Sequence, residues 1–305
     1  MLKLTPVTLI ITTPLLLTSP SYAQTPHLTK QLPIQATETN CPPDIAGCPV
    51  RGDYFTWTNT PIPYLLSPRH GKILNPQPLL RWLPVEGATS YTVTLEGPGV
   101  EGWEKNVTTT AIQYDGDPLQ PGGSYQFFVE TDTGARSWGE PAHRGGVGDG
   151  FEVMTSEERL IVEAAVAERR ATITDPNRLR LEIANVYLEH ELLAEGIAEL
   201  EMLRQEEPSP ELAVRLGNLH FGWLLLVEPS ETYYRQALER LAEPPPLAWA
   251  VALTQLGHLH IVKQEYGEAI AFWRRAQGLY NAMGQPQAAA ELETDIQRWL
   301  PKVEP

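Results

Sequence analysis

The sequence has few cysteines, fewer basic than acidic residues, and few long runs of apolar residues. Its only two cysteines, Cys41 and Cys48, have no further thiol or imidazole groups at regular spacing nearby, which argues against a zinc site. The 23 lysine and arginine residues are outnumbered by 38 acidic ones, so nucleic acid is not expected as a partner. Beyond the first 23 residues, no apolar run is long enough to span a bilayer.

Recognisable catalytic patterns are also missing. The sequence contains no HExxH motif, nucleophile elbow or phosphate-binding loop, and no Ser, Cys or His stands in a recognisable catalytic setting. We therefore expect no enzyme, no catalytic residue, no cofactor and no bound metal. A catalytic site assembled from distant loops would leave no such pattern.

The first 23 residues have the pattern of a secretory signal peptide. Lys3 precedes an apolar stretch from Val7 to Leu17, and small residues at Ser21 and Ala23 favour cleavage after Ala23. The alternative is an uncleaved membrane anchor, but the stretch is shorter than the roughly 20 residues that cross a bilayer. We expect an exported bacterial protein, periplasmic or extracellular.

Removal of the signal would leave 22 basic and 38 acidic residues, a formal charge of −16. Such an excess of acid is typical of a solvated surface that keeps an exported protein dispersed. A cationic partner or an association with the cell envelope is the alternative interpretation.

Residues 24–60 are predicted to form an extended leader, because prolines recur there and the apolar residues have no regular period. Cys41 and Cys48 lie within it, separated by Pro42, Pro43 and Gly47 among others. In an oxidising compartment this spacing favours a small disulfide loop, which would stabilise the chain by about 2 kcal/mol. A metal pair is the weaker alternative.

Residues 61–154 have the period of two that is typical of half-buried strands. In one run, Tyr91, Val93 and Leu95 alternate with threonines, and short apolar runs of this kind are separated by Pro/Gly turns. The pattern predicts a β-sandwich of about seven strands.

Three segments of this region resemble a fibronectin type III-like domain. The segments are Leu80-Arg81-Trp82, Val85-Glu86-Gly87-Ala88-Thr89-Ser90-Tyr91-Thr92-Val93 and Leu119-Gln120-Pro121-Gly122-Gly123-Ser124-Tyr125. The resemblance covers about 85 residues and implies an immunoglobulin/fibronectin III-like fold. It also implies that Trp82 lies in the core and that the Tyr125 hydroxyl bonds to backbone.

A short pattern repeats in residues 155–305. Leu216-Gly217-Asn218-Leu219-His220 returns as Leu256-Gly257-His258-Leu259-His260, and Ile183-Ala184-Asn185-Val186-Tyr187 is a weaker copy. A small residue with apolar neighbours at this spacing is what a helix needs where another helix crosses it closely. The pattern therefore predicts a helical array.

From about Asp175 the chain resembles tetratricopeptide repeats, paired helices of about 34 residues. The spacing is 33 residues from Ala184 to Gly217 and 40 from Gly217 to Gly257. The extra residues are expected around 228–230 and at 243–246, which would make the array irregular. The resemblance implies an all-α superhelix that follows the β-sandwich.

Helices at both ends are expected to cap the array. The first would begin with a Thr155/Glu158 capping box and place Leu160, Ala164 and Ala167 on one face, and the last would begin near Gln287. Four tryptophans are predicted to be core residues: Trp223, Trp249, Trp273 and Trp299. Packing is also predicted for His220 and His260, and His258 and His260 lie too far apart around a helix to bind one metal ion.

The tetratricopeptide resemblance also implies a binding groove along the first helices of the repeats. One exposed position there follows the small residue and falls on Asn185, Asn218 and His258. The predicted groove also contains Arg178, Arg215 and Phe221. Polar groups in such a row would hold an extended peptide or a carboxylate, whereas the alternative is an ordinary solvated helix face.

Together these features predict an exported adaptor or scaffold whose helical groove binds a peptide or protein. The alternative is a protein that binds carbohydrate or an envelope polymer through its β-sandwich, with the helices used for assembly. That alternative requires Trp57, Tyr64 or Trp103 to be exposed for stacking.

Overall fold

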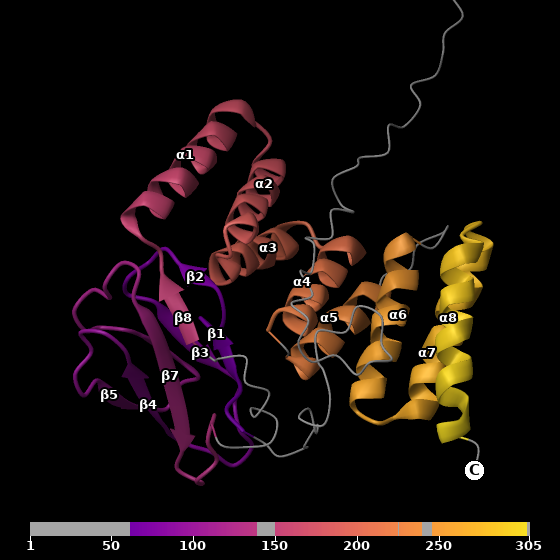
Figure 1. The fold of residues 1–305 in the computed structure, drawn as a ribbon, viewed down its shortest axis with the longest axis horizontal. Coiled ribbons are helices and arrows are strands. Elements are labelled where there is room, and N and C mark those ends of the chain that lie inside the picture. The colour runs from indigo at the N-terminus through magenta and orange to yellow at the C-terminus, as the bar shows by residue number, and fades with distance from the viewer. Residues whose placement is uncertain (1–61, 139–149, 225, 240–245, 304–305) are drawn as a thin grey trace, which may run out of the picture. The chain divides into compact units, whose positions relative to one another are not determined.

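The computed structural model describes residues 62–138, 150–224, 226–239 and 246–303 (Figure 1). The predicted signal peptide (1–23), the leader (24–60) and the Cys41–Cys48 disulfide lie outside the described residues. Within them, strands come first and helices follow. β8 ends at Val153 and α1 begins at Ser156.

The β domain contains two sheets whose side chains share one core. The three-stranded sheet has the order β1 (Leu65–Ser67), β3 (Leu79–Trp82), β6 (Ala111–Gln113). The five-stranded sheet has the order β2 (Lys72–Ile73), β8 (Gly150–Val153), β7 (Ser124–Thr131), β4 (Tyr91–Glu96), β5 (Glu104–Val107). Adjacent strands are antiparallel except β2 and β8, which are parallel.

The predicted period of two decides which side chains enter this core. Burial alternates along β4 and β7, and Trp82 and Phe127 are among the largest fully buried side chains. The Tyr125 hydroxyl accepts a hydrogen bond from the Gln120 N–H at 2.7 Å and donates one to the Pro98 carbonyl at 3.1 Å. Trp82 and Tyr125 therefore lie where the sequence predicted, while membership of the fibronectin type III family stays a prediction.

The C-terminal part is a helical repeat array, as predicted. Helices pair as α2 (Pro176–Glu189) with α3 (Leu193–Glu206), α4 (Pro210–Gly222) with α5 (Val227–Glu239), and α6 (Leu247–Val262) with α7 (Tyr266–Ala282). Flanking them are α1 (Ser156–Thr172) and α8 (Pro286–Trp299), and a 3-10 turn (Leu300–Lys302) follows. Among the described residues, no helix combines the length and apolarity needed to cross a membrane.

The small residues of the repeated pattern lie where two helices of a pair approach closely. A Cβ atom added to Gly217 would lie 2.5 Å from the Tyr234 ring, and one added to Gly257 would lie 2.2 Å from Trp273. Ala184 is fully buried, and in that pair the glycine stands on the second helix: a Cβ atom added to Gly196 would lie 2.7 Å from the Leu188 side chain and 3.4 Å from the Ala184 carbonyl oxygen. Gly217 and Gly257 are therefore equivalent close-packed points, whereas the first pair places its glycine on the facing helix.

The structure corrects the predicted apolar face of α1. Leu160 is 66% exposed, and Ala164 and Ala167 are exposed as well, whereas Val162 and Val166 are buried against α2. Among the described helices, α2 alone packs closely on α1, so a narrow stripe of α1 is covered. The capping box at Thr155 is confirmed: its side chain accepts from the Glu158 N–H, and the Glu158 carboxylate accepts from the Thr155 N–H.

Two further predictions about the array need correction. Residues 228–230 belong to α5 and not to a loop, since the turn before that helix already ends at Leu226. Of the four predicted core tryptophans, Trp273 is 1% exposed, but Trp223, Trp249 and Trp299 are only half-buried. Trp299 belongs to the last helix and stacks on Tyr266, so a tryptophan near the end of the array has fewer neighbours to cover it.

Candidate protein-interaction site

The predicted groove residues lie on the first helices of the pairs, but most are engaged within the chain. The side-chain Oδ1 of Asn185 accepts a hydrogen bond from Arg215 Nη2 at 2.5 Å, which links α2 to α4. Asn218 accepts from the Tyr234 hydroxyl at 2.9 Å, and His258 Nε2 lies 3.9 Å from an Asp295 carboxylate oxygen. The three equivalent positions therefore make three different contacts.

The remaining groove residues are less engaged. Arg178 is exposed in the first turn of α2, and Phe221 is half-buried near the end of α4. Burial lowers the pKa of Arg215, although Glu182 opposes this shift. The structure brings Asn185 and Arg215 together, and binding of a peptide by the whole row stays a prediction.

The predicted core histidines are buried. His220 donates from Nδ1 to the Leu216 carbonyl at 2.8 Å, because that oxygen can only accept. His260 packs on Phe272 and lies between Glu231 and Glu265. Across the described part of the chain, no three His, Cys, Asp or Glu side chains are grouped to hold a metal ion.

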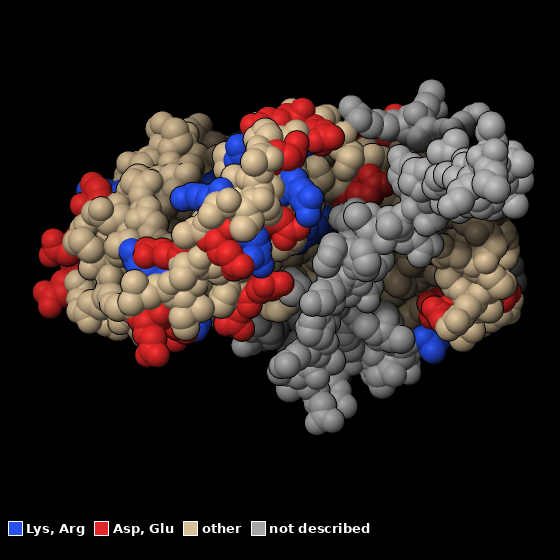
Figure 2. All heavy atoms as spheres, turned by 90° about the horizontal axis from the view of Figure 1, so that it is seen from above, with Lys and Arg blue, Asp and Glu red and all other residues tan. Residues whose placement is uncertain are grey.

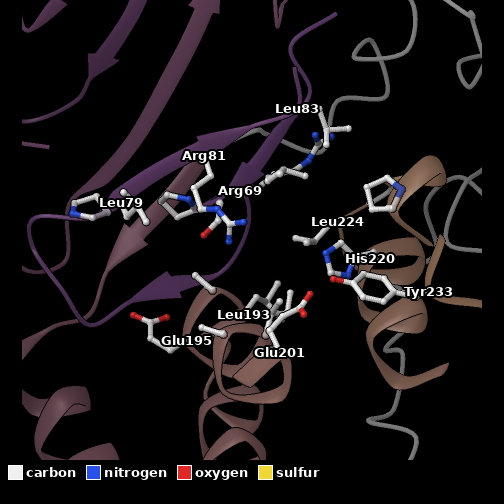
Figure 3. Close-up of a pocket in the computed structure, with 18 of the residues that line it drawn as sticks. Arg69, Leu79, Arg81, Leu83, Leu193, Glu195, Glu201, His220, Leu224 and Tyr233 are labelled. Carbon is white, nitrogen blue, oxygen red and sulfur yellow. The ribbon is translucent and has the colours of Figure 1, made fainter. Parts of the chain in front are cut away.

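A cleft of about 680 Å³ lies between the β domain and helices α3 to α5, and the sequence did not reveal it (Figure 3). Arg69, Leu79 and Arg81 contribute to the wall formed by the β domain. Leu193 and Glu201 from α3, together with His220 and Tyr233 from the next pair, form the opposite wall. None of the six predicted groove residues lines this cleft.

Hydrogen bonds join β2 and the residue after it to the α2–α3 turn and the first turn of α3, and so connect the two walls. The Lys72 N–H donates to the Glu191 carbonyl at 2.9 Å, and the Leu74 N–H donates to the Glu195 carboxylate at 2.7 Å. Lys72 also forms an ion pair with Glu158 at the start of α1. Burial raises the pKa of Glu195, and the bond from Leu74 opposes the shift.

Titration of Glu158 gives this junction a predicted pH dependence. Lys72, followed by the Thr155 cap, lowers the pKa of Glu158 from 4.5 to about 2. The folded chain thus binds this proton less tightly than the unfolded chain, so the contribution to stability is complete above about pH 4.5 and is lost as pH falls toward 2. We expect Lys72→Gln to lower Tm at neutral pH, with a difference from wild type that narrows below about pH 4.5.

Thermal unfolding followed by circular dichroism over this pH range would check the prediction. Lys302→Gln, at an exposed lysine near the C-terminal end of the described chain, is the matched control. If the difference in Tm between Lys72→Gln and wild type does not change with pH, the predicted effect of Lys72 on the pKa of Glu158 is contradicted.

The charges on the surface agree with the composition. On the described part of the face in Figure 2, lysine and arginine side chains lie among acidic ones and form no separate basic stripe.

No known family profile matches the chain, and no curated protein is similar to it. Among solved structures, the crystal structure of MamA is 18% identical, with 47% of this chain and 86% of that chain covered at a TM-score of 0.31. The crystal structure of BtubC (BKLC) from P. vanneervenii is 17% identical, with 48% and 75% covered at a TM-score of 0.32. At these values, neither likeness indicates a function for this chain.

Proposed function

We propose that this chain is an exported protein-interaction scaffold, and that a segment of a partner protein binds in the cleft between β3 and helices α3 to α5. The cleft itself is the observation that carries the proposal. Its volume of about 680 Å³ lies in the range of sites that enclose a ligand. Its walls combine apolar side chains with a few charged and polar ones, as binding sites commonly do.

The helical array supports a scaffold role because stacked helix pairs present extended surfaces to partners. The predicted groove, which runs from Arg178 to His258, would be a second partner-binding surface on the same array. Export is proposed from the N-terminal sequence pattern alone.

The carbohydrate-binding alternative loses one of its three candidate stacking residues. Trp103 is only 9% exposed, and its indole N–H donates to Asp115 at 2.8 Å, so its ring cannot serve as a stacking platform. Tyr64 is half-buried, and Trp57 lies outside the described residues. We therefore favour a protein segment over a sugar as the ligand.

Selection of phage-displayed random peptides on the full chain would test the proposal. We expect the selected peptides to bind Ile197→Asp about tenfold or more weakly, because a carboxylate on the apolar wall would be desolvated by the peptide. Leu79→Asp should have the same effect from the opposite wall, and Leu79 is 47% exposed, so this substitution leaves the core intact.

Ile161→Asp is the matched control, since Ile161 is exposed on α1 and does not line the cleft. The control should bind like wild type. Peptides that bind both cleft variants as tightly as wild type would refute a binding site in the cleft.

A further inference from the structure

The register of β3 decides which side chains enter the cleft. Leu80 and Trp82 point into the β-domain core, so the alternating residues Leu79 and Arg81 point outward. Both line the cleft (Figure 3). An exposed leucine and an arginine two residues apart thus form one continuous patch that is partly apolar and partly cationic.

Arg81 differs from three other charged groups around the cleft, which have partners within the chain. Glu201 is paired with Arg204 at 3.1 Å, Glu195 accepts from the Leu74 N–H, and Arg69 donates to the Leu65 carbonyl at 3.3 Å. Among the described residues, none forms a hydrogen bond or ion pair with the Arg81 guanidinium. In a chain with 38 acidic and 23 basic residues, an arginine that faces a cleft without a carboxylate partner is a candidate for a partner's carboxylate.

The opposite wall offers a hydrogen-bond acceptor. Because His220 donates from Nδ1 to Leu216, its Nε2 carries the lone pair in the neutral ring. Burial lowers the pKa of His220 and the charge of Arg81 adds to this effect, whereas the bond to the Leu216 carbonyl and the charge of Glu201 oppose it. The Tyr233 ring lies beside His220, with centroids 4.9 Å apart, and Leu224 adds apolar surface nearby.

This inference rests on the proposed function. We propose that the bound segment carries a carboxylate next to a bulky apolar side chain. Arg81 pairs with the carboxylate, and the apolar side chain packs between Leu79 on one wall and Ile197 and Leu224 on the other. A backbone N–H of the segment donates to His220 Nε2. Arginine suits this role because its planar guanidinium can bind a carboxylate through two parallel hydrogen bonds.

The carboxylate can come from an Asp or Glu side chain or from the end of a chain, and two phage libraries separate these sources. One library displays internal random segments, and the other displays segments with a free C-terminus. Selection on the full chain should enrich Asp or Glu beside Leu, Ile or Phe in the first library, or apolar C-terminal residues in the second. Fluorescein-labelled copies of the selected peptides, with free or amidated C-termini, then serve as probes in polarisation assays.

The charge of Arg81 is tested directly with these probes. Arg81→Gln should weaken binding about tenfold, and Arg81→Lys should weaken it less because the charge remains without the planar fork. Arg81→Glu should abolish binding of the original peptide and restore binding of a copy in which lysine replaces the acidic residue. Restoration would be a readout that loss of folding cannot produce.

The outcomes distinguish the pairing of Arg81 with a carboxylate from the more general proposal that a protein segment binds in the cleft. Peptides that lose affinity for Ile197→Asp but not for Arg81→Gln or Arg81→Glu would refute the carboxylate pairing and leave the cleft as a binding site. Peptides that lose affinity for none of these variants would refute both. Enrichment of basic instead of acidic residues would also overturn the proposal.

Discussion

Gly257→Ala is expected to lower the free energy of unfolding by about 3 kcal/mol, because α6 has no room for a side chain at this position. A Cβ atom there would lie 2.2 Å from Nε1 and 2.4 Å from Cδ1 of Trp273. The indole cannot move aside easily, since it is 1% exposed and its N–H donates to the Thr254 carbonyl at 3.1 Å. Chemical denaturation followed by circular dichroism would measure the loss.

Gly278→Ala provides the matched control in the neighbouring helix α7. A Cβ atom at Gly278 would meet nothing within 4 Å, so this variant should gain about 1 kcal/mol from helix propensity alone. If both substitutions change stability equally, the close approach of α6 to Trp273 is not the reason for glycine at position 257.

Gly71→Ala is expected to cost about 3 kcal/mol and to weaken any binding in the cleft, because Gly71 lies against the turn between α2 and α3. Its φ angle is +69°, and an added Cβ would lie 2.2 Å from the Glu191 carbonyl oxygen. That oxygen also accepts the Lys72 N–H, so the methyl group would separate the β domain from the helices at the point where they are hydrogen-bonded. Denaturation and the peptide assay described above would measure the two effects.

Gly87→Ala isolates the backbone part of this cost. Gly87 has a similar φ of +81° but nothing within 4 Å of an added Cβ, so alanine should cost only about 1 kcal/mol there. It should also leave peptide binding unchanged. An effect of Gly71→Ala no larger than that of Gly87→Ala would show that the junction tolerates the methyl group.

Local patterns were sufficient to predict the elements and the close-packed positions. The resemblance to a fibronectin type III-like domain implied the positions of Trp82 and Tyr125 in the β domain, and the capping box predicted Thr155 as the N-cap of α1. The recurring small residues identified Gly217 and Gly257 because a helix crossing demands a missing side chain at one specific position. These features follow from neighbours a few residues apart, which a sequence displays directly.

Side-chain environments that depend on residues far away in the sequence could not be predicted from local patterns. The sequence suggested that Leu160 is covered, but only the placement of α2 determines which stripe of α1 is buried. Likewise, Asn185, Asn218 and His258 occupy equivalent positions, yet the bond from Arg215 to Asn185 has no counterpart at the other two.

Periodicity and capping act within one element at a time, so the amino-acid pattern was enough to predict that a strand-rich part precedes a helical repeat array. The outward direction of Leu79 and Arg81 follows from the burial of Leu80 and Trp82 in β3. That α3 to α5 lie opposite these two residues depends on contacts between distant segments. The hydrogen bonds from Lys72 to Glu191 and from Leu74 to Glu195 join segments more than 100 residues apart, and no local pattern encodes that pairing.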